Sequence, residues 1–472
     1  MKRIAPRTSK VGIAGLGYMG LATGVAFAAH GLSVTGYDVK SDVRESTARG
    51  VTPFHERGLA ELLRRQVRSG RFSVVDSAPV LAKAAEGIFL CLPTPSLAGG
   101  GIDLRPLKKG TAELGRALRN VEGYRLVVVK STVLPGTTET VVEPMLRRLS
   151  GKSPHELGVA VNPEFLAEGT MVRDALHPDR IVLGTRDLRS QGWLKRVYRP
   201  FRAQSFLLTP SGAELVKYSS NAFLALKVSF ANEFSRLSEE LGLDIDRVME
   251  AVGADSRIGR RFLNAGPGFG GSCFEKDLKA LVLRARELGV RLRTGEATLS
   301  INDDQAKHIM TLVRKVAGPL EGKTVAVLGL AFKAGTDDVR ESRAFPLVSG
   351  LVREGVRVRV HDPVALSNFR RAWERCPSSN LGSVEFSGSV TESLAEADAA
   401  VVQADWPEYR KWRPEWTRRM KEPCLVDLRR SVKLRTNDAT GLRILALGVG
   451  PDSGESRVEA AVLAAGKGGR RG

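Results

Sequence analysis

The sequence contains few cysteines and few aromatic residues for its length. Its 472 residues include four cysteines, at positions 91, 273, 376 and 424. No pair has CxxC spacing, so we expect neither a disulfide framework nor a bound metal, and a reducing cytoplasm is the expected location. Aromatic residues make up 6% of the chain, which leaves few stacking surfaces for nucleic acid. Nucleic acid is therefore not an expected partner.

Long apolar runs and negative charge are also scarce. Residues 11–29 carry no charge, but five glycines interrupt them and a strand-like segment follows at residues 32–38, so no membrane segment is predicted. Lys and Arg number 72 against 52 Asp and Glu, a net charge of +20. This excess suits anionic ligands such as nucleotides. Because the basic residues are spread along the chain, they are typical of a solvated surface.

A glycine-rich turn follows the first predicted strand. Gly15, Gly17 and Gly20 have the spacing GxGxxG and open a predicted helix, and Asp38 ends the next strand. Such glycines let a pyrophosphate approach the helix N-terminus. The carboxylate accepts a hydrogen bond from a ribose 2′-hydroxyl and repels a 2′-phosphate. The pattern predicts a dinucleotide-binding domain that uses NAD rather than NADP.

The order of the predicted elements indicates more than one domain. Apolar runs at residues 87–91 and 126–130 predict buried parallel strands, residues 211–241 predict a long helix, and a second strand with a glycine turn begins near residue 323. We expect an α/β fold of two Rossmann-like, doubly wound parallel-sheet domains joined by a central long-helix domain. The expected bounds are 1–205 for the NAD-binding domain, 206–305 for the helical dimerisation domain, 306–450 for the C-terminal α/β domain and 451–472 for a mobile tail.

One cysteine has a setting unlike the other three. Cys273 follows the glycine-rich residues 266–271 and precedes Lys276 and Asp277. Backbone without Cβ atoms can approach a ligand closely, and a nearby cation stabilises a thiolate. The other cysteines are expected to be buried small hydrophobic residues. A candidate nucleophile together with a nicotinamide site indicates oxidation through a covalent intermediate.

Further polar residues occur at positions suited to a ligand. Lys217 and Asn221 share one face of the long helix, where they could hold a water or an oxyanion. Glu164 lies in a turn after a predicted strand, and a helix cap is the favoured interpretation of it from local pattern alone. Basic residues at three loop positions are predicted to bind a nucleotide diphosphate. They are Arg257, Arg260 and Arg261; Lys333 and Arg340; and Arg429 and Arg430.

Taken together, these segments resemble the UDP-glucose/GDP-mannose dehydrogenase family of nucleotide-sugar 6-dehydrogenases. The resemblance extends from about residue 10 to residue 435. Besides the glycine fingerprint it rests on KSTV at 130–133, NPEFLAEG at 162–169, ELVKYxxNAFL at 214–224, GGSCFxKD at 270–277 and AFKxxTxDxRES at 331–342. It implies an NAD domain, a central helical dimer domain and a nucleotide-sugar domain, in a homodimer or larger homo-oligomer.

The resemblance also implies a reaction and the residues that perform it. The C6 alcohol of a nucleotide-linked hexose is oxidised to a carboxylate with two NAD. Cys273 forms a thiohemiacetal and then a thioester; Lys217, Asn221 and a water bound by Asp277 stabilise oxyanions; Glu164 and Thr132 manage water and proton transfers. NAD contacts are implied at Gly15, Gly17, Tyr18, Met19, Gly20, Asp38, Thr94, Thr132, Glu168, Lys276 and Arg340. Substrate contacts are implied at Glu164, Phe165, Leu166, Lys217, Asn221, Arg257 (from a second subunit), Phe269, Gly270, Lys333 and Arg429.

Two departures and several alternatives accompany this resemblance. Glu275 occupies a position where many members have proline, and its charge would disfavour the Cys273 thiolate if it faced the sulfur. Pro135 falls one place later than usual. UDP-glucose is the expected substrate, with GDP-mannose or a UDP-N-acetylhexosamine as rivals. A non-catalytic nucleotide- or nucleic-acid-binding protein and a dehydrogenase that stops at the aldehyde are further alternatives, and neither would require Cys273.

Overall fold

The computed structural model describes residues 9–376, 383–433 and 441–450. The predicted tail at 451–472 lies outside the described residues. The chain divides into two compact units, residues 1–220 and 221–472, and the long predicted helix begins in the first and ends in the second. The three expected domain bounds stay predictions. In the described ranges no helix combines the length and the apolar character needed to cross a bilayer.

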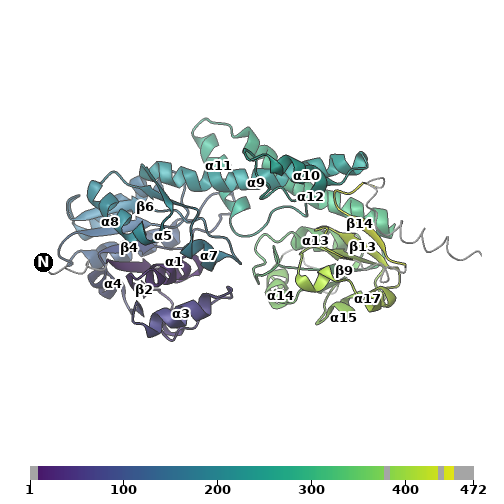
Figure 1. Cartoon of the computed structure of the whole chain (residues 1–472), viewed down its shortest axis with the longest axis horizontal. Coiled ribbons are helices and arrows are strands. Elements are labelled where there is room, and N and C mark those ends of the chain that lie inside the picture. The colour runs from purple at the N-terminus through teal and green to yellow at the C-terminus, as the bar shows by residue number, and fades with distance from the viewer. Residues whose placement is uncertain (1–8, 377–382, 434–440, 451–472) are drawn as a thin grey trace, which may run out of the picture. The chain divides into compact units, whose positions relative to one another are not determined.

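Unit 1 contains an eight-stranded sheet in the order β3-β2-β1-β4-β5-β6-β7-β8 (Figure 1). Its strands are β1 (Lys10–Ala14), β2 (Ser33–Tyr37), β3 (Phe72–Val74), β4 (Gly87–Leu90), β5 (Arg125–Val129), β6 (Leu157–Val161), β7 (Arg180–Gly184) and β8 (Gln204–Leu208). All neighbours are parallel except β6 and β7, which are antiparallel. Between them the chain returns through a loop and one short helix instead of the full crossover that parallel pairing needs.

Helices cover both faces of this sheet, which gives unit 1 two cores. The helices are α1 (Tyr18–Ala29), α2 (Ser41–Ala48), α3 (Leu59–Arg68), α4 (Ala78–Ala84), α5 (Arg105–Leu118), α6 (Glu143–Ser150), α7 (Met171–Leu176) and α8 (Leu188–Tyr198), with a π-helical turn η1 (Thr138–Val142) and a 3-10 turn η2 (Arg199–Phe201). Leu126 and Val128 of β5 join the core under α1, α3 and α8, whereas Val127 and Val129 join the core under α4, α5 and α6. This alternation explains why the strand is apolar at nearly every position.

Unit 2 contains a second sheet of six parallel strands, in the order β11-β10-β9-β12-β13-β14 (Figure 1). The strands are β9 (Thr324–Leu328), β10 (Arg357–His361), β11 (Val384–Phe386), β12 (Ala399–Val402), β13 (Cys424–Asp427) and β14 (Arg443–Ala446). The helices are α9 (Pro210–Glu240), α10 (Ile245–Ala254), α11 (Phe274–Glu287), α12 (Arg293–Ala317), α13 (Ala344–Arg353), α14 (Leu366–Glu374), α15 (Val390–Leu394), α16 (Pro407–Arg410) and α17 (Pro414–Arg419).

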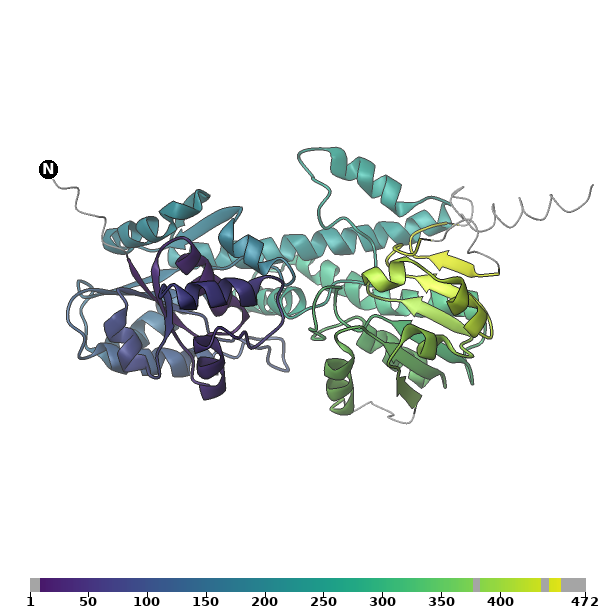
Figure 2. The ribbon, with the colours of Figure 1, turned by 60° about the horizontal axis from the view of Figure 1, so that its bottom comes forward.

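The helices of unit 2 also pack on the two faces of their sheet. Helix α12 packs on β12, β13 and β14, α13 packs on β10, and α15 packs on β9 and β10 (Figure 2). The two doubly wound sheets and the helical segment between them in sequence confirm the predicted fold class. The long helix predicted at 211–241 is α9, and a shorter helix, α11, begins directly after Cys273.

The first strand of each sheet ends in the same glycine turn. Gly15 has a φ of 98° and donates its N–H to the Tyr37 carbonyl at 2.8 Å. Gly329 has a φ of 97° and donates its N–H to the His361 carbonyl at 2.8 Å. These φ values belong to the left-handed region that glycine tolerates. A Cβ on Gly15 would also overlap the Cys91 carbonyl oxygen. In each turn the residue that accepts the glycine N–H is followed directly by an aspartate. The aspartates are Asp38 in the first unit and Asp362 in the second.

Candidate active site

The predicted dinucleotide turn of unit 1 has the geometry that a pyrophosphate and a ribose require. Gly17 is the N-cap of α1, no side chain caps the helix, and a Cβ at Gly17 would meet no atom within 4 Å. The N-terminus of a helix favours a negatively charged group such as a pyrophosphate, and the glycine leaves room for one to approach. The Asp38 carboxylate is held beside the turn by the backbone N–H groups of Leu16 at 2.8 Å and Lys40 at 3.0 Å. These residues fit NAD, with the phosphates over α1 and a ribose hydroxyl on Asp38.

Other predicted cofactor residues surround the same end of the sheet. Tyr18 and Met19 form the first turn of α1, and the Tyr18 ring stacks on Phe54 with centroids 4.0 Å apart. The Thr94 hydroxyl donates to the Thr132 carbonyl at 2.9 Å, which joins the loops after β4 and β5. Both loops lie at the carboxyl ends of parallel strands, where doubly wound sheets bind ligands.

Glu164 and Lys217 form a buried ion pair. The Lys217 Nζ lies 2.8 Å from Glu164 Oε1, and the side chains are 5% and 12% exposed. The Leu166 N–H donates to Glu164 Oε2 at 2.6 Å. Burial acts to raise the pKa of Glu164, but Lys217, this N–H and Lys130 together hold that pKa below its usual value. The helix-cap interpretation of Glu164 is wrong, because α7 starts later and its N-cap is Thr170.

A buried lysine behind this pair was not singled out from the sequence. Lys130 directly follows β5 and donates to Asn162 Oδ1 at 2.9 Å, and the Tyr198 hydroxyl donates to the same oxygen. Burial lowers the pKa of Lys130 to about 8, partly offset by Cys91 and Glu164. A lysine directly after the apolar run 126–129 is the signal that could have found it. Lys130 thereby adds positive charge beside Glu164.

The loop after β6 is fixed by two further contacts. The guanidinium carbon of Arg180 lies 4.0 Å from the centroid of the Phe165 ring. The ammonium of Lys217 lies 5.7 Å from the same centroid. Glu56, from a segment far earlier in the chain, accepts hydrogen bonds from the N–H groups of Gly169 at 2.8 Å and Met171 at 3.0 Å. The loop that holds Leu166 and Glu168 is therefore anchored at both ends.

In unit 2, Cys273 lies at a helix N-terminus. It is the N-cap of α11, its side chain is exposed, and its carbonyl accepts the Asp277 N–H at 2.9 Å. The partial positive charge of a helix N-terminus favours an anion there, so this position suits a thiolate. Cys91 and Cys424 are buried as predicted, and burial raises the pKa of Cys91 to about 12. Cys376 was also predicted to be buried, but it is partly exposed because it follows the end of α14.

Asp277 lies one turn into α11 and is 1% exposed. It accepts the Asn221 side-chain amide at 2.7 Å on one oxygen and pairs with Lys276 Nζ at 2.5 Å on the other. The ammonium of Lys276, expected to stabilise the thiolate, is thus engaged by its neighbour. The structure brings Asn221, Lys276 and Asp277 together in unit 2, as it brings Glu164, Phe165 and Lys217 together in unit 1.

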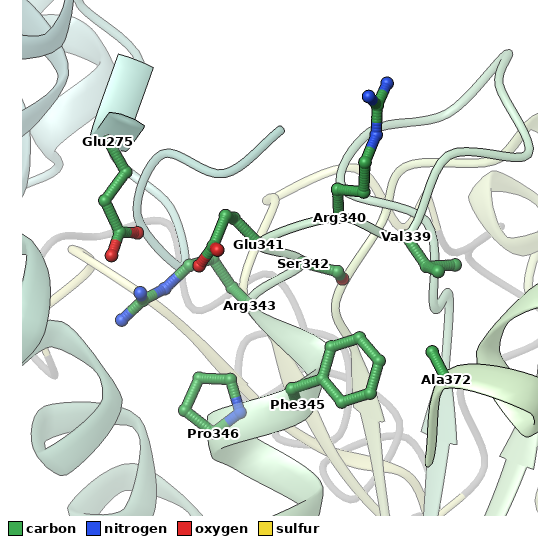
Figure 3. Close-up of a pocket in the computed structure, with 9 residues that line it drawn as sticks. All are labelled: Glu275, Val339, Arg340, Glu341, Ser342, Arg343, Phe345, Pro346 and Ala372. Carbon is green, nitrogen blue, oxygen red and sulfur yellow. The ribbon is translucent and has the colours of Figure 1, made fainter. Parts of the chain in front are cut away.

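Glu275, the departure from the family pattern, has a partner of its own. Its carboxylate pairs with Lys279 Nζ at 2.5 Å, one turn along α11. It also lines a cavity of about 460 Å³ in which its carboxylate and that of Glu341 are turned toward the Arg343 side chain, whereas Arg340 is turned away from it (Figure 3). Burial and the charge of Glu275 raise the pKa of Glu341. The negative charge of Glu275 is therefore compensated by the positive charges of Lys279 and Arg343.

The aspartate at the second glycine turn accepts more hydrogen bonds from the protein than the aspartate at the first. Asp362 is 3% exposed, and its Oδ2 accepts the Leu330 N–H at 2.7 Å, the Ala331 N–H at 3.1 Å and the Trp406 indole N–H at 3.0 Å. Its other oxygen accepts two further backbone N–H groups, 2.7 and 2.9 Å away. A carboxylate with these contacts has no capacity left for a ribose hydroxyl. This turn is unsuited to a dinucleotide.

The predicted basic residues of unit 2 have distinct surroundings. Arg429 follows β13 and donates from Nε to the Gln403 carbonyl at 2.8 Å, at the carboxyl end of the sheet. Arg430 instead bonds Asp246 at 2.8 Å and two backbone carbonyls, so it connects parts of the fold. The Arg257 side chain is 86% exposed and is paired with Asp255 at 2.6 Å.

The remaining predicted ligand residues lie near the β9 loop. Lys333 is partly buried, with its ammonium 5.5 Å from the Phe332 ring centroid. Arg340 pairs with Asp338 at 2.5 Å. Gly270 packs so closely that a Cβ would overlap the Glu341 carbonyl oxygen. Contacts of all these residues with a ligand stay predictions.

Models of one protein family match most of this chain. Three domains of the UDP-glucose/GDP-mannose dehydrogenase family match: the NAD binding domain over residues 9–202, the central domain over 211–304 and the UDP binding domain over 326–434. A UDP-glucose 6-dehydrogenase of Haloferax volcanii (AglM) is 41% identical over 432 residues, which cover 90% of this chain and 98% of that protein. The Bacillus subtilis UDP-glucose 6-dehydrogenase TuaD is 35% identical, covering 92% and 91%.

Solved structures agree with these matches. A UDP-glucose dehydrogenase from Pyrobaculum islandicum superposes with a TM-score of 0.85 at 38% identity and covers 94% of this chain and 99% of its own. A UDP-D-ManNAc dehydrogenase from Pyrococcus horikoshii gives 0.79 at 27% identity, covering 94% and 100%. With all three domains matched in order, the chain belongs to the UDP-glucose/GDP-mannose dehydrogenase family.

Proposed function

We propose that this protein oxidises UDP-glucose to UDP-glucuronate with two NAD per sugar. The observation that carries the proposal is the presence in one chain of a complete dinucleotide turn and of a cysteine at the N-terminus of α11, with Asp277 and Asn221 beside it. The relatives that support UDP-glucose as substrate are 33–41% identical, compared with 27% for the UDP-D-ManNAc dehydrogenase structure. GDP-mannose and UDP-N-acetylhexosamines are not favoured.

The proposed reaction has three steps, two oxidations and a hydrolysis, and the site residues can assist each step. Bound NAD would accept one hydride in each of the two oxidations. After the first, the Cys273 sulfur adds to C6 of the aldehyde, a C–S bond forms, and the carbonyl oxygen gains negative charge that Lys217 and Asn221 stabilise. Loss of the second hydride leaves a thioester. Water adds to it, the C–S bond breaks, and the thiolate returns as the carboxylate forms.

Glu164 is suited to direct the water and proton transfers. Its low pKa keeps it ionised at neutral pH, so it can accept a proton from the C6 hydroxyl or from the attacking water. Its pairing with Lys217 holds the carboxylate in one orientation. Thr132, on the loop after β5, would position the same water. Lys333 and Arg429 would bind the nucleotide diphosphate.

An end-point count of NADH tests this function. With excess NAD and a limiting, known amount of UDP-glucose, we expect two NADH per sugar by absorbance. One NADH per sugar would mean that the aldehyde is released and would overturn the covalent mechanism. No NADH with UDP-glucose, but two with GDP-mannose or a UDP-N-acetylhexosamine, would reject the substrate and leave the chemistry in place.

The face of α9 in unit 2 supports a homodimer as the assembly. Phe223, Phe230, Phe234, Leu237 and Leu241 follow one another at helical spacing and are 37–60% exposed. An apolar stripe of this extent is typical of an interface between proteins. Light scattering should give a mass of at least two chains, and the double change Phe230→Glu and Phe234→Glu should give one chain. A monomeric unaltered protein would contradict the proposal.

We place the reaction in a reducing compartment, which for this chain means the cytoplasm. A nucleophilic thiol that is exposed, as Cys273 is, requires protection from oxidation. Cell fractionation with an antibody to the chain would check this location, and recovery in an oxidising compartment would contradict it.

A further inference from the structure

The loop that leads to Cys273 is held by side chains that are not among the predicted catalytic or ligand-binding residues. Residues 266–269 lie between α10 and α11, and buried amide groups from α9 and α12 bond their backbone. We infer that Asn302 is a positioning residue, which fixes the backbone before Cys273 so that the thiolate reaches C6 of the aldehyde. This inference rests on the proposed role of Cys273 as nucleophile.

Asn302 bonds both backbone groups of one residue. Its Oδ1 accepts the Phe269 N–H at 2.8 Å, and its Nδ2 donates to the Phe269 carbonyl at 3.2 Å. Asn302 is 1% exposed and Phe269 is 4% exposed, so no bulk water can replace either bond. Gly268 has a φ of 106°, and a Cβ there would lie 2.5 Å from Asn302 Oδ1. The glycine and the amide are therefore matched to each other.

A second pair of amides holds the start of the loop. The Gly266 N–H donates to Asn232 Oδ1 at 2.7 Å, and Gln305 Nε2 donates to the Gly266 carbonyl at 2.8 Å. Asn232 comes from α9, and Gln305 lies one helical turn after Asn302 on α12. Arg236 in turn donates to Gln305 Oε1 at 3.0 Å, which fixes the orientation of that amide. Gly266 is thereby bonded through both of its backbone groups, as Phe269 is.

We call the side chains that bond residues 266–269 the loop clamp. Arg343, at the N-terminus of α13, connects this clamp to a helix that packs on the second sheet. Its Nε donates to the Pro267 carbonyl at 3.2 Å, and its Nη2 donates to the Asn302 carbonyl at 2.8 Å. Closer to the cysteine, the Gly271 N–H donates to the Arg340 carbonyl at 3.1 Å. Four of the positions before Cys273, namely Gly266, Pro267, Phe269 and Gly271, are thus bonded to side chains or backbone outside the loop. None of these bonds is needed to form α9, α12 or the sheet.

Such a clamp has a mechanistic purpose because nucleophilic attack depends steeply on position. A glycine-rich segment is free to adopt many conformations, and a displacement of about 1 Å at a reacting atom can lower the rate by about a hundredfold. The bonds to Phe269 and Gly266 remove that freedom without placing bulky side chains near the ligand. Asn302 acts through the backbone and does not touch the reacting atoms.

The test compares two reactions of the aldehyde, of which only one needs the thiol. Oxidation of the UDP-linked 6-aldehyde by NAD requires attack by Cys273, whereas its reduction by NADH to UDP-glucose does not. For Asn302→Ala we expect oxidation to fall at least tenfold in kcat, with the KM for NAD within twofold and reduction within twofold of the unaltered enzyme. Asn302→Asp keeps the acceptor for the Phe269 N–H and should lose less.

A matched control removes a buried hydrogen bond that joins α9 directly to α12. Ser229 on α9 donates to the Thr298 carbonyl of α12 at 2.8 Å, and this bond does not involve residues 266–269. Ser229→Ala should change neither reaction. Equal losses of oxidation and reduction in Asn302→Ala, or wild-type oxidation in both Asn302 variants, would overturn the inference.

One measurement needs no variant and guards against a protein that fails to fold. In the unaltered enzyme the amide hydrogens of Gly266 and Phe269 should exchange slowly with solvent, and fast exchange at both would overturn the clamp. The proposed function fails separately: if Cys273→Ser oxidises the aldehyde at the normal rate, the covalent mechanism is wrong whatever Asn302 does.

Discussion

Replacing Cys273 by serine is expected to lower steady-state turnover with UDP-glucose by at least about a thousandfold, with the affinity for NAD unchanged. A serine hydroxyl at the N-terminus of α11 stays protonated at neutral pH and is a far weaker nucleophile than a thiolate. The dinucleotide turn at Gly15 and Asp38 lies in unit 1 and does not involve Cys273. Steady-state NADH formation and calorimetric titration with NAD measure the two quantities.

A matched control uses the cysteine that is also partly accessible. Cys376→Ser, after the end of α14, should change neither turnover nor NAD affinity. Full activity in Cys273→Ser would refute the thioester. A loss of NAD affinity in Cys273→Ser would instead mean that the substitution had disturbed the fold.

Replacing Lys217 by methionine is expected to have the second-largest effect. It removes a cation that we propose stabilises developing oxyanions, and the loss of one such group typically lowers kcat by about a hundred- to a thousandfold. It also leaves Glu164 buried without its main partner. Lys195→Met, on the exposed surface of α8, removes the same charge and should leave kcat unchanged. Unaltered kcat in Lys217→Met would exclude an electrostatic role.

The same variant has a predicted pH signature. Lys217 is the leading cause that keeps the pKa of Glu164 low, against burial, which raises it. A depressed carboxyl pKa keeps the base ionised as the pH falls, so the acid limb of kcat/KM lies at low pH in the unaltered enzyme. In Lys217→Met the pKa rises and the limb should move to higher pH. The pairing also stabilises the fold above the unfolded carboxyl pKa, and that stability is lost as the pH falls through the folded pKa.

The sequence was sufficient to predict the elements that follow from periodicity and the motifs that follow from spacing. β1, α1 and β2 with Asp38 are where the glycine fingerprint predicts them, because that motif is local in the chain. The hydrogen bond between Asn221 and Asp277 was not predicted, because the resemblance implied only that both residues serve the same reaction. The two residues are 56 positions apart, and no local pattern reports which side chains meet across a fold.

Other features could not be predicted because they depend on packing at long range. Nothing near Asn302 in the sequence identifies Phe269, 33 positions away, as its partner. The helix cap assigned to Glu164 is wrong because the next helix begins only at Met171, and the partner of Glu164 is instead Lys217, 53 positions away on α9. The sequence alone indicated that the charge of Glu275 could disfavour the Cys273 thiolate. It does not show that this carboxylate pairs with Lys279 and lines a cavity with Arg343.

The recurrence of one glycine turn after β1 and after β9 bears on how such a chain can diversify. The backbone at Gly15 and Gly329 is the same to within a degree of φ, yet only Asp38 keeps lone pairs for a ligand. At Asp362 four backbone N–H groups and the Trp406 indole consume the carboxylate. The same strand-and-turn geometry can therefore be kept while the hydrogen-bonding capacity of the aspartate for a ligand is lost. Engineers who seek a second dinucleotide pocket in this scaffold should begin with Trp406 rather than with the glycine.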